Sequence, residues 1–555
     1  MHSVLRALVA SIAALALVPA VAAAQTQVGQ GPNAYKVTEA YIPTSNPTIT
    51  LHADVMRPAG LPDDVETPVI LSIGPYFNHS HQAATDIDPT RPNLPNSRFD
   101  DLINEGKIFE NGYTLVYVDL PGFGGSSGCN DFGGPNERLA AKTAIEWAAA
   151  QEWSNTKVGM WGKSYDGWTQ VMAMAENPTG LAATVIQSPI IDGYRTLYQN
   201  GIHYDQGWYV TPALYQAIDV LPPTVNEEPA YYLNWALGEN AACYIANIGQ
   251  QTAFIDKDDP AGFWEARDIV DEAKEHSDDV AVLWSHGFLD ANTKPDNFLD
   301  VFDGLKGPHR GFFGQFDHVR GNQDDLVGRS QGVFIGQAMR WFDEYLKGNA
   351  GAAGADNPVE VADGGGRWRA EQQWPPADAV AKAMPLNDGS YTDDDTSSAS
   401  SPVGVWSFSK PVATATRIAG VPKLTVTATT DAPRAQLTAL LYDVDATGKA
   451  RLITRGAKAL TGTGEVTFEL YPQDWRLLAG RRLGVLIAGD DTAWYLAPHS
   501  QQDVAISGAS LSVPVLTAAR TSFLTNSTKT QAMGAVPETT IDPATIADNT
   551  VDFGF

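Results

Sequence analysis

The sequence predicts an α/β domain with a mostly parallel sheet, followed by a smaller all-β domain. Between residues 65 and 315, short apolar runs rich in β-type residues alternate with helical patterns, which is typical of parallel strands joined by crossover helices. From residue 389 to about 520 only strand patterns recur, separated by Gly, Pro, Asp and Asn. A turn of small residues at 162–167 joins a strand pattern to a helix pattern.

The strand patterns divide into three groups. Residues 25–65 alternate apolar and polar positions, which predicts antiparallel strands. The parallel sheet is expected at Pro68–Ile73, Tyr113–Val118, Lys157–Trp161, Ala183–Gln187, Val280–Trp284 and Arg310–Phe313, with a helix at Asn136–Gln151. The all-β domain is expected to be a jelly roll of the galactose-binding type, with strands at Lys423–Thr429, Leu437–Tyr442, Glu465–Leu470 and Leu483–Ala488.

The N-terminus carries the pattern of a secretory leader. Arg6 precedes an apolar run from Ala7 to Val21, and three alanines at 22–24 follow. We therefore expect a signal peptide cleaved after Ala24, with a retained membrane anchor as the alternative. The mature protein is expected to lie outside the cytoplasm, free of the membrane.

These patterns predict the following domains. Residues 1–24 form the signal peptide, 25–189 and 279–350 the catalytic domain, and 190–278 an aromatic-rich helical cap inserted into it. Residues 351–388 form a Gly/Ala/Pro-rich linker, 389–520 the jelly roll, and 521–555 a polar, acidic tail that we expect to be mobile.

Composition narrows the function further. A net charge of −28 over 555 residues, with no basic cluster, argues against a nucleic-acid partner. The only cysteines, Cys129 and Cys243, form a disulfide or remain two buried thiols. Two cysteines are too few for a cysteine-rich structural zinc site. Composition does not indicate an oligomeric state.

The turn Gly162–Gly167 indicates a catalytic serine. A serine on a tight strand-to-helix turn is how an α/β-hydrolase exposes its nucleophile above the sheet, and small residues flank it because two backbones approach closely there. Ser164 is the candidate. The usual pattern has glycine two residues after the serine, whereas here Asp166 holds that place and Gly167 follows.

A serine nucleophile needs a histidine base and an acid that orients it, in the chain order serine, acid, histidine. His318 follows the last predicted core strand and Asp290 follows the strand before it, so both fit this order. The alternative bases are His286 and His309, with His286 expected beside the site. Asp317 is the alternative acid, disfavoured because an adjacent residue does not easily reach the far ring nitrogen.

Two further groups complete the expected chemistry. The oxyanion needs donors, and we expect the backbone N–H of Tyr165 and the hydroxyl of Tyr76, for which an ordinary packed aromatic is the alternative. A metal held by His286, Asp290 and His318 is disfavoured because no helical H-x-x-x-H pair supports it. We expect neither a metal nor an organic cofactor.

Together these motifs resemble one family, the Xaa-Pro dipeptidyl-peptidases with the related cocaine-esterase-type and α-amino-acid ester hydrolases. The resemblance spans roughly residues 40 to 515 and rests on G-x-S-Y-x-G at 162–167, the run Phe263–Asp268, His286–Asn292, Arg340–Asp343 and Trp374–Pro376 before a jelly roll. It implies Ser164 as nucleophile, Asp290 as acid, His318 as base, and Tyr76 with the Tyr165 amide as oxyanion donors.

The resemblance also implies a substrate, with two departures. The family often has arginine where this chain has Pro121, and tryptophan where it has Phe316. The leading hypothesis is a dipeptidyl-peptidase that releases N-terminal Xaa-Pro through an acyl-enzyme. It requires a carboxylate for the substrate ammonium, and the predicted cap offers Asp192, Asp205, Glu227 and Glu228, with Tyr194, Tyr198 and Tyr204 nearby.

Two other functions are considered. One keeps the catalytic serine but takes an ester or acylated amine, as in the esterase branch. The other is a non-catalytic module that binds sugar or cell wall through an exposed aromatic platform, for which Trp494-Tyr495 is the nearest candidate.

Overall fold

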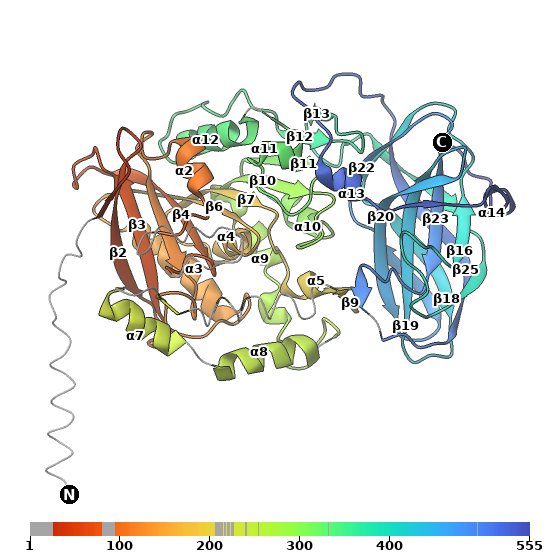
Figure 1. Cartoon of the computed structure of the whole chain (residues 1–555), viewed down its shortest axis with the longest axis horizontal. Helices are drawn as coiled ribbons and strands as arrows, with labels where there is room; N and C mark the ends of the chain where they lie inside the picture. Colours follow the sequence, from red (N-terminus) through yellow and green to blue (C-terminus); the bar gives the residue numbers. More distant parts are fainter. Residues whose placement is uncertain are drawn as a thin grey trace, which may run out of the picture.

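The computed structural model describes residues 26–79, 95–205, 227–238, 241–253, 255–330, 332–496 and 498–555, together with 215, 218, 222 and 223. The predicted signal peptide, 1–24, lies outside the described residues. Figure 1 shows an α/β domain joined to a β-sandwich, drawn in blue, with β9 between them. Among the described residues, no helix combines the length and the apolarity that a membrane crossing requires.

The α/β domain contains one large mixed sheet. The order of its described strands is β1-β2-β3-β5-β4-β6-β7-β10-β11-β12-β13. Neighbours from β5 to β12 pair in parallel, whereas β1, β2, β3 and β13 pair antiparallel. The strands are β1 (Thr26–Val28), β2 (Tyr35–Pro43), β3 (Thr50–Pro58), β4 (Thr67–Gly74), β5 (Thr114–Asp119), β6 (Ser154–Lys163), β7 (Leu181–Gln187), β10 (Ala281–Gly287), β11 (His309–Gly314), β12 (Val359–Ala362) and β13 (Trp368–Glu371).

Helices cover both faces of this sheet. Side chains of β4 alternate between two apolar clusters: Val69 and Leu71 face α3 and α4, while Ile70 faces α2 and α12. Burial on both faces explains why these strands are continuous apolar runs. The helices outside the predicted cap are α2 (Asp100–Gly106), α3 (Pro135–Ala149), α4 (Tyr165–Glu176), α10 (Phe298–Phe302), α11 (Asp324–Val327) and α12 (Val333–Tyr345).

The insertion between β7 and β10 contains the expected helices, but its first and last segments pack against the β-sandwich and the α/β core. Its elements are α5 (Gly193–Leu197), β8 (Tyr198–Gln199), β9 (Ile202–Tyr204), α7 (Pro229–Gly238), α8 (Ala241–Ala253), η1 (Glu265–Arg267), α9 (Val270–Glu275) and η2 (Ser277–Asp279). Helix α9 packs against α4 in the main core, where Ala273 is buried. Strand β9 pairs with β24 (Tyr495–Leu496) of the β-sandwich.

The second domain is the predicted jelly-roll sandwich. One described sheet follows the order β21-β18-β25-β17-β22, with β14 and β15 also on β25, and the other follows β16-β23-β19-β20-β26. Its strands are β14 (Ala379–Pro385), β15 (Gly389–Thr392), β16 (Val405–Phe408), β17 (Thr416–Gly420), β18 (Lys423–Thr429), β19 (Ala435–Val444), β20 (Lys449–Leu460), β21 (Gly464–Glu469), β22 (Gln473–Leu477), β23 (Arg482–Ala488), β25 (Asp503–Leu516) and β26 (Glu538–Thr540).

The structure changes two predicted boundaries. The expected linker supplies β12 and β13 to the large sheet and β14 to the sandwich, so the crossing is confined to the segment around Trp374. The expectation of a mobile tail is wrong. Residues 521–555 form α13 (Gln531–Ala535), β26 and α14 (Pro543–Asp548), and they bury Met533, Ile541, Ile546 and Phe553. Ile541, Ile546 and Phe553 pack into the sandwich, whereas Leu524 packs against the α/β core, so apolar contacts hold the tail although its composition is polar.

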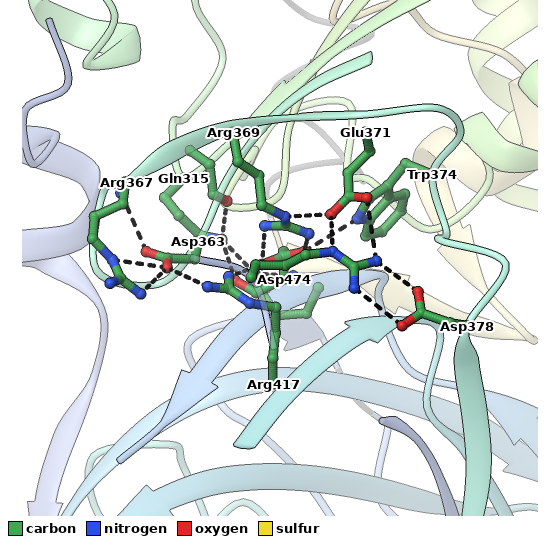
Figure 2. Close-up of polar contacts among 12 residues, drawn as sticks. Gln315, Asp363, Arg367, Arg369, Glu371, Trp374, Asp378, Arg417 and Asp474 are labelled. Atoms are coloured by element: carbon green, nitrogen blue, oxygen red, sulfur yellow. Dashed lines mark hydrogen bonds and ion pairs between the residues drawn. The ribbon is translucent and has the colours of Figure 1, made fainter. Parts of the chain in front are cut away.

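A buried ionic network joins the two domains (Figure 2). Asp474 of β22 accepts hydrogen bonds from Arg369 of β13 at 2.6 and 3.0 Å and from Arg417 of β17 at 2.8 Å. The indole of Trp374 donates to the same carboxylate at 3.3 Å. Because all four side chains are buried, the network fixes how the sandwich sits against the large sheet.

Candidate active site

Ser164 lies on a strained turn between β6 and α4. Its backbone has φ 70° and ψ −121°, a left-handed φ that is rare for a residue with a side chain. A Cβ on Gly162 would approach the Asp166 carbonyl oxygen to 2.3 Å, and one on Gly167 would lie 3.1 Å from the Gln187 carbonyl oxygen. Glycine is therefore required at 162, and little space remains at 167, which accounts for the displaced glycine of the motif.

Asp290 and His318 form a hydrogen-bonded pair at the same edge of the sheet as Ser164. His318 Nδ1 lies 2.9 Å from Asp290 Oδ2. Strands β6, β10 and β11 run parallel, so the residues that follow them meet at one edge. Lys163 Nζ donates to the His318 carbonyl at 3.4 Å, which ties the serine turn to the histidine loop.

A second set of contacts links the turn to the aspartate loop. The Ser188 carbonyl accepts from the Ser164 N–H at 3.2 Å and from Thr293 Oγ1 at 3.2 Å, and Thr293 Oγ1 is 3.0 Å from Asp290 Oδ2. In the described part of the chain, no hydrogen bond joins Ser164 Oγ directly to His318 Nε2. The scaffold brings the three segments together and leaves this last contact open.

The alternative residues are placed elsewhere. His309 is exposed at the start of β11 and contacts the Gly307 carbonyl. His286 is fully buried, stacks on Phe298, and its Nε2 is 3.9 Å from Asp290 Oδ2, as expected for a residue beside the site. Asp317 accepts from backbone N–H groups of Ala291 and His318. Asp290 is therefore the acid in contact with the imidazole.

The pair is electrostatically suited to proton transfer. Burial alone would raise the pKa of Asp290, but His318 and the backbone N–H of Asn292 hold that pKa below its usual value. Burial lowers the pKa of His318 from its ordinary 6.5, and this effect outweighs the attraction of Asp290. At neutral pH the pair is thus a carboxylate beside a neutral imidazole, the state that a general base requires.

The two groups predicted to bind the oxyanion, the Tyr165 N–H and the Tyr76 hydroxyl, lie beside Ser164. Tyr165 is the first residue of α4, so its N–H has no acceptor within the helix. Tyr76, in the loop after β4, is buried, and its hydroxyl is 3.1 Å from that of Tyr215 and interacts with the Ser164 side chain. Burial raises the pKa of Tyr76. The phenol therefore keeps its proton and can donate it in a hydrogen bond.

Sequence reasoning missed Arg98, which supports this arrangement. The Arg98 guanidinium lies 3.8 Å from the ring centroid of Tyr76 and forms two hydrogen bonds with Asp166, at 2.8 and 2.9 Å. Asp166 occupies the position where the usual motif has glycine. Because the Asp166 carboxylate is buried at this turn, it needs a partner of opposite charge. That need is the signal in the sequence that could have pointed to a basic residue nearby.

Two of the four predicted ammonium ligands contact basic side chains of the protein. Asp192 caps α5 and accepts from Lys257 Nζ at 2.8 Å, and Glu227 lies 2.9 Å from His79 Nδ1. Asp205 donates its backbone N–H to the Trp494 carbonyl and is half-buried. Glu228 is also half-buried, and its pKa is raised by burial and by Glu39.

The tyrosines of the predicted cap are engaged as well. Tyr194 and Tyr198 donate to backbone carbonyls of Ile255 and Gln251. The Tyr204 hydroxyl accepts from Tyr471 at 3.0 Å. These contacts hold the insertion together and against the sandwich.

Trp494-Tyr495, the nearest candidate for the alternative of an exposed aromatic platform, does not form one. Tyr495 is buried in β24, and the Trp494 indole donates to the Tyr471 hydroxyl at 2.8 Å. Both rings pack between the sandwich and β9. Cys129 is disulfide-bonded; the side chain of Cys243, the only other cysteine, lies outside the described side chains.

Comparison with known proteins assigns the family. A family model described as X-Pro dipeptidyl-peptidase (S15 family) matches residues 48–320, and one described as the X-Pro dipeptidyl-peptidase C-terminal non-catalytic domain matches 351–531. The chain belongs to the X-Pro dipeptidyl-peptidase family. It is therefore a member of a hydrolase family in which the same two domains occur together.

The relatives have low sequence identity to this chain, but the similarity extends over most of its length. A Bacillus anthracis protein assigned as an Xaa-Pro dipeptidyl-peptidase is 25% identical over 463 residues, which cover 73% of each chain. A Bacillus cereus protein with the same assignment is 24% identical over 525 residues, covering 83% of this chain and 86% of its own length.

Two solved structures share both domains of this chain, because each aligns over 90% of its length. An α-amino acid ester hydrolase aligns with TM-score 0.66 and 18% identity over 90% of this chain and 100% of its own. A CocE/NonD family hydrolase of Staphylococcus aureus aligns with TM-score 0.68 and 16% identity over 90% and 98%. At these identities the likeness concerns the fold.

Proposed function

We propose that the protein is a serine hydrolase in which Ser164, His318 and Asp290 act as nucleophile, general base and orienting acid. The observation that carries this proposal is the 2.9 Å contact between His318 Nδ1 and Asp290 Oδ2, at the sheet edge where Ser164 sits at φ 70°. Because Asp290 holds Nδ1, the second ring nitrogen of His318 is left to take the Ser164 proton.

The reaction then follows from the placement of the donors. Ser164 Oγ attacks the carbonyl carbon as His318 removes its proton, and the Tyr76 hydroxyl and Tyr165 N–H stabilise the oxyanion. His318 returns the proton to the leaving amine, which leaves an acyl-enzyme. In the second step His318 removes a proton from water as the water oxygen attacks the acyl carbonyl, and it returns that proton to Ser164 Oγ as the acid leaves. In the substrate complex, the Ser164–His318 hydrogen bond closes, as is common for catalytic contacts that are open in the free enzyme.

For the substrate, we propose a peptide that begins with Xaa-Pro, from which the enzyme releases the Xaa-Pro dipeptide; the family assignment and the peptidase relatives support this. Esters and acylated amines are the second candidate. One observation favours them: two of the four carboxylates predicted to bind a substrate ammonium, Asp192 and Glu227, contact Lys257 and His79 instead. Export through the N-terminal leader stays a prediction.

One comparison of substrates tests these proposals. Wild-type protein and Ser164→Ala are assayed with Gly-Pro-p-nitroanilide, its N-acetylated form and p-nitrophenyl acetate. We expect cleavage of the free-amine dipeptide amide alone, lost by about 10⁴-fold or more in Ser164→Ala. Cleavage of the ester without the amide would assign the second candidate.

Labelling by a fluorophosphonate separates the chemistry from the substrate. Folded wild-type protein should be labelled and Ser164→Ala should not. If both proteins stay unlabelled while their circular dichroism spectra are those of folded proteins, the serine hydrolase proposal fails whatever the substrate.

A further inference from the structure

A cluster of histidines and carboxylates lies outside the catalytic groups, at the antiparallel side of the large sheet. His52 and Asp54 share one face of β3, and His79 lies in the loop after β4, three positions beyond Tyr76. All three are almost completely buried. One ligand atom from each lies within 4.8 Å of the other two.

Each imidazole is held by a carboxylate on its Nδ1. Asp119 Oδ2 is 2.9 Å from His52 Nδ1, and Glu227 Oε2 is 2.9 Å from His79 Nδ1. A carboxylate on one ring nitrogen is the usual support of a metal-binding histidine, because it fixes the tautomer that presents the other nitrogen to the ion. Both Nε2 atoms are thereby available on the side of Asp54.

The Nε2 atoms have the surroundings of ligands. His79 Nε2 is 3.2 and 3.1 Å from the two oxygens of Asp54. His52 Nε2 is buried without a hydrogen bond, 3.3 Å from Glu39 Oε2. Ligand atoms bound at about 2.0–2.2 Å around a tetrahedral zinc are about 3.4 Å apart. The separations of His79 Nε2 from Asp54 and of His52 Nε2 from Glu39 are close to that value, and the ligand atoms of His52, Asp54 and His79 lie within 4.8 Å of one another, so side-chain movements would have to bring the remaining pairs closer.

Charge also favours a cation here. Within the described residues, no lysine or arginine forms an ion pair with Glu39, Asp54 or Asp119. Asp119 Oδ1 is buried without a hydrogen-bond partner. The ionisable partners of these carboxylates are His52 and His79, so their buried negative charge must be balanced either by protons on these imidazoles or by a metal ion bound between them.

We propose that His52, Asp54 and His79 bind one divalent first-row transition-metal ion of the zinc class, with Glu39 as fourth ligand. Imidazole and carboxylate are the ligands such ions accept, whereas calcium and magnesium take oxygen. The side chain of Glu39 is 24% exposed, which provides an entry path. The ion has no part in the serine chemistry.

The ion would act as a structural clip. His79 stacks on Tyr231 of α7 with ring centroids 4.8 Å apart, and the backbone N–H of His79 donates to the Tyr231 hydroxyl at 3.1 Å. The site therefore joins β3, the loop that carries Tyr76, and the insertion. Binding only to the folded chain stabilises it.

Metal content tests the proposal directly. Full-length protein is stripped with a chelator, incubated with Zn²⁺ or Co²⁺, passed over a desalting column and analysed by elemental mass spectrometry. We expect one ion per chain for wild type, together with a visible Co²⁺ absorption band and a rise in Tm when zinc is added. His52→Gln and His79→Gln should each retain at least about 10-fold less metal than the wild type.

His309→Gln is the matched control, because His309 is exposed and distant from the cluster. It should bind metal as wild type does. The proposal is overturned if stripped wild-type protein retains no more zinc or cobalt than a desalting blank, which needs no variant to fold. It is also overturned if folded His52→Gln and His79→Gln keep the wild-type stoichiometry. Either result would assign the cluster to protons shared between histidines and carboxylates.

Discussion

Gln315 Nε2 donates to Gln473 Oε1 across the domain boundary at 2.6 Å. Gln315 is fully buried and lies three residues before His318, and Nε2 also reaches the Asp474 carbonyl at 3.0 Å. Gln473 and Asp474, the first two residues of β22, therefore hold the segment that carries the proposed base. This contact gives the sandwich a role in positioning the site, a role the sequence did not indicate.

Asp474 is the centre of this boundary, and its charge should matter for stability. Asp474→Asn keeps the shape but leaves Arg369 and Arg417 buried without their common carboxylate. We expect it to lower the free energy of unfolding by about 3–5 kcal/mol in urea denaturation. Glu176→Gln, which removes the partly exposed pair with Arg138, should cost about 0–1 kcal/mol. Equal effects of the two changes would contradict the importance of the boundary network.

The pair of Arg98 and Asp166 should show strong coupling. Arg98→Met leaves a buried carboxylate and should destabilise the protein by about 3–5 kcal/mol. In the double variant with Asp166→Asn no uncompensated charge remains, so most of that loss should be recovered. A double-mutant cycle from urea denaturation measures the coupling. Simple additivity of the two single effects would show that the ion pair does not act as a unit.

Tyr76 should contribute to kcat through its hydroxyl. Tyr76→Phe keeps the ring against Arg98 but removes the proposed oxyanion donor, so we expect kcat to fall by about 10²–10³-fold with little change in Tm. Tyr215→Phe, which removes the partner hydroxyl 3.1 Å away, is the control and should have a smaller effect. If Tyr76→Phe keeps the wild-type kcat, the Tyr165 N–H acts without this second donor.

The pH dependence should report on His318. Its pKa is lowered from 6.5, with burial as the main cause, so the neutral imidazole predominates at pH 6.5. Since the base must be neutral, kcat/KM should fall with the protonation of His318 in an acid limb centred below pH 6.5 and reach its plateau at higher pH. A pH–rate profile between pH 4 and 8 checks this; an acid limb centred above pH 6.5 would contradict it.

Asp290→Asn should alter that profile. The carboxylate raises the pKa of His318, so its loss should move the acid limb to lower pH. The rate on the plateau should also fall, by about 10⁴-fold, because the imidazole loses the group that fixes its tautomer. Asp317→Asn is the control: among the described residues Asp317 accepts hydrogen bonds from backbone N–H groups, and its charge raises the pKa of His318 less than that of Asp290 does. Its plateau rate should match that of the wild type, and its acid limb should move less than that of Asp290→Asn.

The sequence by itself determined the chain's strand and helix order. A strand that is buried on both faces, such as β4, is a continuous apolar run, and a turn where two backbones approach closely requires glycine, as at Gly162. Both requirements leave a pattern among residues that are close in the sequence. The same holds for Ser164, Asp290 and His318, because each follows a strand and parallel strands end at one edge. The predicted strands and the sandwich were found for this reason.

Only the tertiary structure decided what meets across long sequence separations. Arg98 reaches Asp166 from a different segment, Gln315 reaches Gln473 from another domain, and the polar tail is ordered by the sandwich it covers. His52 and His79 gain their carboxylates from β5 and the insertion. Hydrogen bonds and ion pairs of this kind depend on the direction and burial of each side chain. Both are determined only when the helices and strands have packed, so a local sequence pattern does not predict these contacts.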